Sequence, residues 1–202
     1  MVEPLFCNID DKSIVYRSVS ELFNVCTYFI VDSHNVIVVD PGKLSQDVCV
    51  WLESFQYLNK IIYITHEHFD HHYDVNYLLS FPNTSVFVPS SEFEMAVTDT
   101  RTNLSHYYNS PIQSNLNKKS KVDFFKVIPT PGHSRFSFCF KYKNILFGGD
   151  TLINAKYLVL KLPRANKSDY KESIKNLNNL LELDTVVLPG HGELFCFDKI
   201  FI

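Results

Sequence analysis

Short apolar runs recur along the chain and are separated by turn residues, a pattern typical of β-strands in a protein that mixes strands and helices. The runs are rich in Val, Ile, Phe and Tyr, and many end at Gly, Pro, Asn or Asp. We predict strands over residues 25–31, 35–39, 60–64, 85–88, 122–128, 136–142, 145–147 and 185–188.

Two segments between the strands have the apolar spacing of amphipathic helices. Residues 45–55 place three apolar side chains on one side, and residues 169–183 carry a stripe of Ile and Leu. We expect the second helix to begin with a capping box made by Asp169 and Glu172. Early strands in succession, followed by alternating helices and strands, predict β-sheets covered by helices in an α/β (α+β) protein. A chain of 202 residues without a linker or an internal repeat predicts a single domain over residues 1–202.

Composition narrows the class of protein. The net charge of −3 gives no basic surface, so we expect no nucleic-acid partner. No apolar run reaches the roughly 18 residues that a membrane span needs, so we expect no membrane association. The N-terminus does not have the pattern of a signal peptide. Five cysteines, without a Cys-x-x-Cys pair, suit a reducing compartment, and we predict a cytoplasmic protein.

One long polar stretch, residues 98–121, has no clear periodicity. A segment of this length in a domain of this size is usually a substrate lid or a mobile loop, and both interpretations stay open.

Four potential metal ligands lie within six residues just after the predicted strand 60–64. They are His66, His68, Asp70 and His71. Imidazole and carboxylate are ligands that suit zinc, iron and related metals. A histidine-rich surface loop without a ligand is the alternative, but this density of donors favours a metal site.

Three further donors follow other predicted strands, each after glycine: His133, Asp150 and His191. Glycine lets the backbone turn tightly where a side chain must be aimed inward. Any one of these residues could be a buried histidine or a turn residue, but their recurrence favours a common site. Five histidines and two aspartates are too many ligands for one tetrahedral zinc, and they suit two ions that share a carboxylate.

These motifs resemble those of the metallo-β-lactamase-fold hydrolases, and among them the short single-domain form of the glyoxalase II-like (hydroxyacylglutathione hydrolase-like) branch. The resemblance covers almost the whole chain. It rests on residues 24–28, 40–42, 66–71, 131–133, 149–151 and 190–192. It implies a four-layer αβ/βα sandwich of two mixed β-sheets flanked by helices.

The resemblance also implies which residues bind metal. The first ion would be held by His66, His68 and His133, the second by Asp70, His71 and His191, and Asp150 would bridge both. Asp40 would orient a ligand, or would only form the turn before Pro41. We expect two divalent ions, and zinc is the first candidate. Iron or manganese is also possible, because nitrogen and oxygen ligands without a thiolate accept all three metals.

The implied reaction is hydrolysis of a small thioester or ester by a hydroxide that bridges the two ions, with Asp70 steering that hydroxide as a catalytic residue. Four alternatives stay open. They are a lactonase or β-lactamase-like hydrolase, a mononuclear iron persulfide dioxygenase, a phosphodiesterase, and a degenerate member that only binds a ligand. We expect a small-molecule substrate, and the sequence leaves the oligomeric state open.

Several departures from the family pattern leave the identity of the substrate open. The eleven residues after His191 hold no counterpart of the glutathione-binding region. An apolar segment, residues 154–160, replaces the usual Gly-Arg pair, and Arg135-Phe136 replaces a Pro-Gly pair. His72 and Tyr73 stand where two glycines are common, and we predict His72 to be a surface residue on a following helix.

Overall fold

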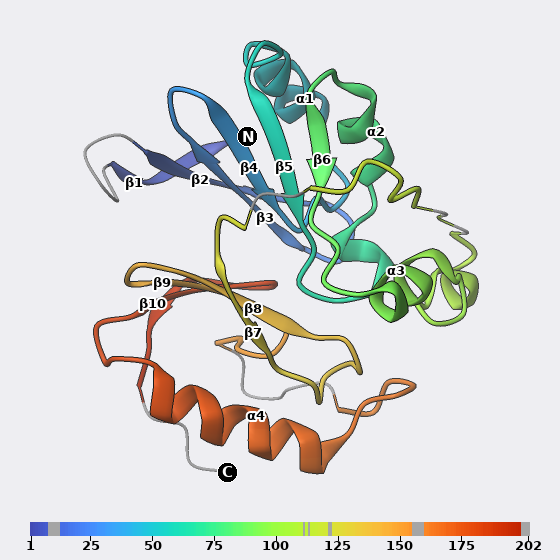
Figure 1. The fold of residues 1–202 in the computed structure, drawn as a ribbon, viewed down its shortest axis with the longest axis vertical. Helices are drawn as coiled ribbons and strands as arrows, with labels where there is room; N and C mark the ends of the chain where they lie inside the picture. Colours follow the sequence, from blue (N-terminus) through green and yellow to red (C-terminus); the bar gives the residue numbers. More distant parts are fainter. Residues whose placement is uncertain (8–12, 111, 113, 121–122, 155–159, 199–202) are drawn as a thin grey trace. The chain divides into compact units, whose positions relative to one another are not determined.

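Two mixed β-sheets form the framework of the protein in the computed structural model (Figure 1). The structure describes residues 1–7, 13–110, 112, 114–120, 123–154 and 160–198. The chain divides into two units, each with one sheet. Unit 1 comprises Met1–Ile64 and His68–Asp123, and unit 2 comprises Thr65–Glu67 and Phe124–Ile202.

The sheet of unit 1 has six strands in chain order. They are β1 (Glu3–Cys7), β2 (Ile14–Val19), β3 (Cys26–Val31), β4 (Asn35–Val39), β5 (Asn59–Tyr63) and β6 (Thr84–Val86). Strands β1 to β4 pair antiparallel, whereas β5 and β6 continue parallel to β4. The central strands are buried along most of their length, which explains their nearly continuous apolar sequences.

Short helices accompany the strands of unit 1. They are α1 (Gln46–Glu53), the 3-10 turn η1 (Phe69–His71), α2 (Val75–Ser80), α3 (Ser91–Thr98) and the 3-10 turn η2 (Ser105–Tyr108). Helix α1 buries Val48 and Leu52. Its Trp51 ring lies 5.1 Å from the rings of both Tyr16 and Phe29, so α1 packs against β2 and β3.

The sheet of unit 2 has five strands. Their order is β11 (Phe195–Cys196), β10 (Val186–Pro189), β9 (Ile145–Gly149), β8 (Phe138–Tyr142) and β7 (Lys126–Pro129). Strands β9 and β10 are parallel, and the other pairs are antiparallel. Helix α4 (Lys167–Leu180) packs its Ile174 and Leu177 into the core that Leu146 and Val187 contribute from the sheet (Figure 1).

The predicted fold class is confirmed, since the protein consists of two mixed sheets with flanking helices. Strand β4 has the predicted bounds, and the other strands differ from the predictions by one to four residues at an end. The start of the predicted strand 122–128 lies outside the described residues. Strands β1, β2 and β11 and helices α2 and α3 were not predicted. The assignment of residues 1–202 to a single domain stays a prediction.

Helix α4 corrects one local prediction. Its N-cap is Asn166, whose side-chain oxygen accepts hydrogen bonds from the backbone N–H groups of Ser168 at 2.8 Å and Asp169 at 3.2 Å. Asp169 therefore lies in the first turn and is not the cap. Among the helices of the described segments, none is long and apolar enough to cross a membrane.

Candidate metal centre

Four predicted ligands lie in unit 2, each just after a strand in the sequence. His133 follows β7, Asp150 follows β9 and His191 follows β10. Because β7, β9 and β10 run in the same direction, their carboxyl ends meet at one edge of the sheet. His66 belongs to the short segment Thr65–Glu67, which is attached to the same unit: the backbone N–H of Phe138 donates to the Thr65 carbonyl at 2.7 Å.

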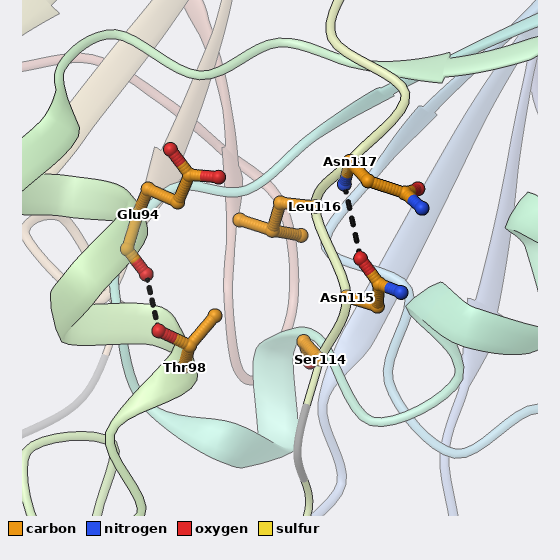
Figure 2. Close-up of a pocket in the computed structure, with 6 residues that line it drawn as sticks. All are labelled: Glu94, Thr98, Ser114, Asn115, Leu116 and Asn117. Carbon is orange, nitrogen blue, oxygen red and sulfur yellow. Dashed lines mark hydrogen bonds between the residues drawn. The ribbon is translucent and has the colours of Figure 1, made fainter.

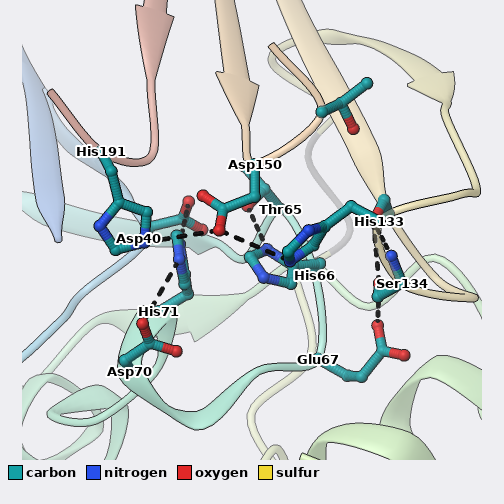
Figure 3. A network of polar contacts seen from close by, with 12 residues as sticks. Asp40, Thr65, His66, Glu67, Asp70, His71, His133, Ser134, Asp150 and His191 are labelled. Carbon is teal, nitrogen blue, oxygen red and sulfur yellow. Dashed lines mark hydrogen bonds and ion pairs between the residues drawn. The ribbon is translucent and has the colours of Figure 1, made fainter. Parts of the chain in front are cut away.

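Asp150 is the centre of this group. Its Oδ2 lies 3.5 Å from Nε2 of His133 and 3.4 Å from Nε2 of His191 (Figure 3). The rings of His66 and His133 meet edge to face with their centroids 5.0 Å apart. Both Asp150 separations exceed the 2.7–3.2 Å typical of an N–H···O hydrogen bond. A carboxylate oxygen that faces two imidazole nitrogens at such distances can serve as a ligand shared by two ions.

The position directly before Asp150 has no room for a side chain. Gly149 has a φ of +48°, and a Cβ there would lie 2.5 Å from Oγ1 of Thr65. The Thr65 hydroxyl is 3.1 Å from Nδ1 of His66. This contact fixes one nitrogen of the His66 ring and leaves Nε2 to act as the ligand atom.

The loop that carries His133 is equally constrained. Gly132 has a φ of +145°, and a Cβ there would lie 2.4 Å from the Cα of Tyr170 in α4. The Ser173 hydroxyl of the same helix donates to the Pro131 carbonyl at 2.7 Å. The close approach of α4 therefore explains why glycine precedes this histidine.

Glu67 forms a buried network that the sequence analysis did not predict. The Ser134 hydroxyl donates to Glu67 Oε2 at 2.6 Å (Figure 3). The Ser134 and Ser137 hydroxyl oxygens are 2.8 Å apart. Burial raises the pKa of the Glu67 carboxyl, and the hydrogen bond from Ser134 opposes this rise. The sequence signal was an acidic residue between two predicted ligands, with serine directly after His133.

In unit 1, His71 is oriented by Asp40. Nδ1 of His71 lies 2.9 Å from Oδ2 of Asp40, and both residues are buried. Nε2 of His71 faces Oδ2 of Asp70 at 3.8 Å (Figure 3). Asp40 also turns the backbone with a φ of +52°, so it does more than form a turn, and its role in orienting a metal ligand stays a prediction. His68 caps η1 with an extended backbone and is 4% exposed.

His72 corrects the prediction of a surface residue. Its side chain is fully buried, and its Nδ1 lies 2.7 Å from the hydroxyl oxygen of Ser114. Ser114 is 42 positions away, and no local sequence pattern reveals this contact. His72 also precedes α2, which begins at Val75, and does not lie within it.

The stretch that contains Ser114 runs beside β6. The backbone N–H of Val86 donates to the Lys118 carbonyl at 2.8 Å, and that of Ser120 donates to the Val86 carbonyl at 2.7 Å. This stretch and α3 line a polar cavity of about 500 Å³ that is open to solvent (Figure 2). The lining residues are Glu94, Thr98, Ser114, Asn115, Leu116 and Asn117. A role of residues 98–121 as a lid stays a prediction.

The donors present fit divalent metals of the zinc and iron group. The histidine and aspartate residues that qualify as metal ligands in the described part of the chain are the seven predicted from the sequence. They offer imidazole nitrogen and carboxylate oxygen and no thiolate, a set compatible with Zn, Fe or Mn. Four lie in unit 2 and three in unit 1, and a site shared by all seven stays a prediction.

Comparison with known proteins gives three kinds of likeness. A probable metallo-hydrolase of Streptococcus pyogenes serotype M6 is 29% identical over 204 residues, which cover 92% of this chain and 87% of that protein. A hydroxyacylglutathione hydrolase of Blochmanniella pennsylvanica is 33% identical over 120 residues, which cover 59% of this chain and 43% of that enzyme. The structure of TTHA1623 in a di-iron-bound form has a TM-score of 0.71 at 21% identity, covering 89% of this chain and 93% of that one.

The fold of two mixed sheets, with histidines and aspartates just after several strands, and the likeness to a probable metallo-hydrolase place the protein in the class of metallo-hydrolases. The family model of the metallo-beta-lactamase superfamily matches residues 21–191. The chain belongs to this superfamily. The match to the hydroxyacylglutathione hydrolase spans less than half of that enzyme's length.

Proposed function

We propose that this protein hydrolyses a small thioester or ester at a centre of two divalent ions. The seven residues His66, His68, Asp70, His71, His133, Asp150 and His191 would hold the ions. The observation that carries the proposal is the position of Asp150 Oδ2, 3.5 Å from His133 Nε2 and 3.4 Å from His191 Nε2. A carboxylate that faces two imidazole nitrogens can serve as a shared ligand, with zinc as the first candidate ion.

Two divalent ions supply a strong nucleophile from water at neutral pH and polarise a carbonyl oxygen. The residues of the chain orient the imidazoles that would bind these ions. Asp40 accepts a hydrogen bond from Nδ1 of His71 and thereby presents Nε2 as the ligand atom. Thr65 acts on His66 in the same way.

Asp70 is the proposed catalytic carboxylate. Its side chain is 15% exposed, whereas that of His71 is fully buried, so Asp70 is within reach of solvent. A carboxylate at this position can accept a proton from the attacking water and steer it toward the carbonyl carbon. A thiolate leaving group is stable at neutral pH, so hydrolysis of a thioester does not require a strong general acid.

The choice of a thioester is supported by the likeness to the hydroxyacylglutathione hydrolase of Blochmanniella pennsylvanica. The S. pyogenes relative, which this chain matches over most of both lengths, is named only as a probable metallo-hydrolase. A cytoplasmic protein without a nucleic-acid or membrane partner is part of the same proposal.

Metal analysis of the purified protein, with a panel of thioesters, lactones and phosphodiesters, tests the proposal. We expect two divalent ions per chain and the highest kcat/KM on a thioester or ester. His68→Ala should abolish turnover and keep the fold, whereas His34→Ala, on an exposed turn, should change neither. One iron per chain with oxygen consumption on a persulfide would identify a dioxygenase instead. Full activity in His68→Ala would contradict the ligand assignment.

A further inference from the structure

A carboxylate buried between two predicted metal ligands needs an explanation of its own. Glu67 is 1% exposed. A buried carboxylate is unfavourable unless hydrogen bonds and opposite charge compensate for the lost water. Unit 2 provides this compensation. The Ser134 hydroxyl donates to Glu67 Oε2 at 2.6 Å. The charged carboxylate is also favoured by the backbone N–H groups of Glu67 and Phe136 and by the charge of Arg164.

The hydrogen bonds have a defined direction. A serine hydroxyl has one proton, and that of Ser134 goes to Glu67 Oε2. Ser137 must therefore donate its own proton to the Ser134 oxygen at 2.8 Å, while the backbone N–H of Ser134 donates to the Ser137 oxygen at 3.3 Å. All three side chains are at most 4% exposed. The chain of hydrogen bonds is thus complete and closed to water.

This network joins the two chain segments that carry His66 and His133. Glu67 directly follows His66, and Ser134 directly follows His133. The two imidazole rings meet edge to face at 5.0 Å, while Figure 3 shows Glu67 directed toward Ser134 and away from the His66 ring. Since 66 residues separate the two histidines, non-covalent contacts hold these segments together, and they include this network and the hydrogen bond from the Phe138 N–H to the Thr65 carbonyl.

We propose that Glu67 is a positioning residue for metal binding, acting through Ser134 to hold His66 and His133 at the spacing that one ion requires. This inference rests on the proposed function, because it takes both histidines as ligands. Residues that orient metal ligands typically change affinity by about 10- to 100-fold when they are replaced. The network sets the affinity for the ion and does not touch the substrate.

Zinc affinity of the full chain, measured on apo protein by competition with a chromophoric chelator, tests the proposal without substrate. Ser134→Ala should lower the affinity of the tighter site by about 10- to 100-fold. Ser134→Thr keeps the hydroxyl and should stay within about threefold of the natural protein. Glu67→Gln should weaken binding less than Glu67→Ala, because the amide oxygen still accepts from Ser134.

A control separates positioning from a general loss of stability. Ser105→Ala removes another fully buried serine hydroxyl, in unit 1, which donates to the Thr100 carbonyl at 3.4 Å. It should leave zinc affinity unchanged. The double variant of Glu67→Ala and Ser134→Ala should lose no more affinity than the worse single variant, since both act through one contact. Thermal unfolding of each apo variant reports on the fold independently.

The outcomes for the inference and for the proposed function are distinct. If Ser134→Ala and Glu67→Ala bind zinc as tightly as the natural protein, the positioning role is overturned. Equal losses in Ser134→Ala and Ser105→Ala would overturn it as well. Should the Glu67 variants not fold, Ser137→Ala, which removes only the far end of the network, should still lower affinity measurably. A natural protein that binds zinc but hydrolyses no substrate overturns the hydrolase alone.

Discussion

Nδ1 of His71 lies 2.9 Å from Oδ2 of Asp40, and both side chains are buried. The carboxylate accepts a hydrogen bond from the Nδ1–H group, which fixes the tautomer and the orientation of the imidazole. Asp40 also has a φ of +52°, a left-handed backbone that aspartate and asparagine tolerate better than other residues with a side chain. The carboxylate of Asp40 and its left-handed backbone therefore both help to position the imidazole of His71.

Two replacements of Asp40 should test these properties together. Asp40→Asn keeps an acceptor and tolerates the left-handed backbone, whereas Asp40→Ala loses both. We expect Asp40→Ala to be less stable than Asp40→Asn by about 1–2 kcal/mol, from backbone strain alone. Urea unfolding of the apo proteins measures the difference. Equal stabilities would show that the strain at this turn is relieved in the variant.

Glycine at position 132 should be irreplaceable. In Gly132→Ala the new Cβ would lie 2.4 Å from the Cα of Tyr170, in a backbone with a φ of +145°, so helix α4 must move. We expect a loss of about 2–5 kcal/mol in the free energy of unfolding, from strain and overpacking together. Gly192→Ala is the control: its φ is +83°, but nothing lies within 4 Å of the new Cβ. That variant should lose only about 1–2 kcal/mol.

The N-cap of α4 offers a test of the fold that does not replace a predicted ligand. Asn166→Ala removes the acceptor for the N–H groups of Ser168 and Asp169 and should cost about 1 kcal/mol. The same substitution at the exposed Asn176, in the middle of the helix, should be neutral or slightly stabilising, because alanine favours helix. Chemical denaturation of both variants gives the comparison, and similar losses at the two positions would contradict the cap.

Stability at alkaline pH should depend on Tyr170. Burial raises the pKa of Tyr170 to about 12 from its ordinary value of 10.0. Because the folded pKa is the higher one, the folded protein holds the phenol proton longer than the unfolded chain does. The contribution of Tyr170 to stability is therefore complete below pH 10 and falls as the pH rises toward 12. Tyr170→Phe should flatten this part of the stability profile, measured as urea midpoints between pH 8 and 11.

That comparison has an internal reference. The Tyr170 hydroxyl donates to the Thr151 carbonyl at 3.3 Å, so the phenylalanine variant should be somewhat less stable at pH 8. The two stability curves should then approach each other as the pH rises. Parallel curves over the whole range would show that Tyr170 is not responsible for the alkaline loss.

Removal of metal should destabilise the protein reversibly. An ion that binds only the folded state adds about 2.7 kcal/mol when its free concentration is 100 times its Kd. Thermal unfolding before and after a chelator, and again after zinc is restored, measures this linkage. We expect a lower Tm without metal and full recovery on its return. A Tm that the chelator leaves unchanged would argue against a bound ion in the natural protein.

The class of fold could be predicted from the sequence, whereas the bounds of most strands and several whole elements could not. Strand β4 could be bounded because Asn35 and Asp40 interrupt a continuous apolar run. Strand β2 was missed because only some of its side chains are buried, and Val19 at its end is exposed. Helix α2 has six residues, too few for a periodicity of 3.6 to be recognised.

The errors at the candidate site have a common physical cause. His72 was predicted on the surface, but its burial depends on Ser114, which is distant in the sequence. Glu67 is visible in the sequence between two histidines, but its proposed role depends on Ser134 in another loop. A ligand is recognisable from its own chemistry, whereas a residue that supports a ligand is recognisable only from its partner.

The donor set has a consequence for the behaviour of the protein under oxidation. Cys26 and Cys139 are buried thiols and Cys196 is an exposed one, and none of them belongs to the candidate ligands of the described residues. Oxidants convert accessible thiols to sulfenic acid or mixed disulfides, and a zinc site built on cysteine loses its ligands in this way. A centre of imidazole and carboxylate would keep its ligands when these thiols are oxidised, so thiol oxidation alone would not release its metal.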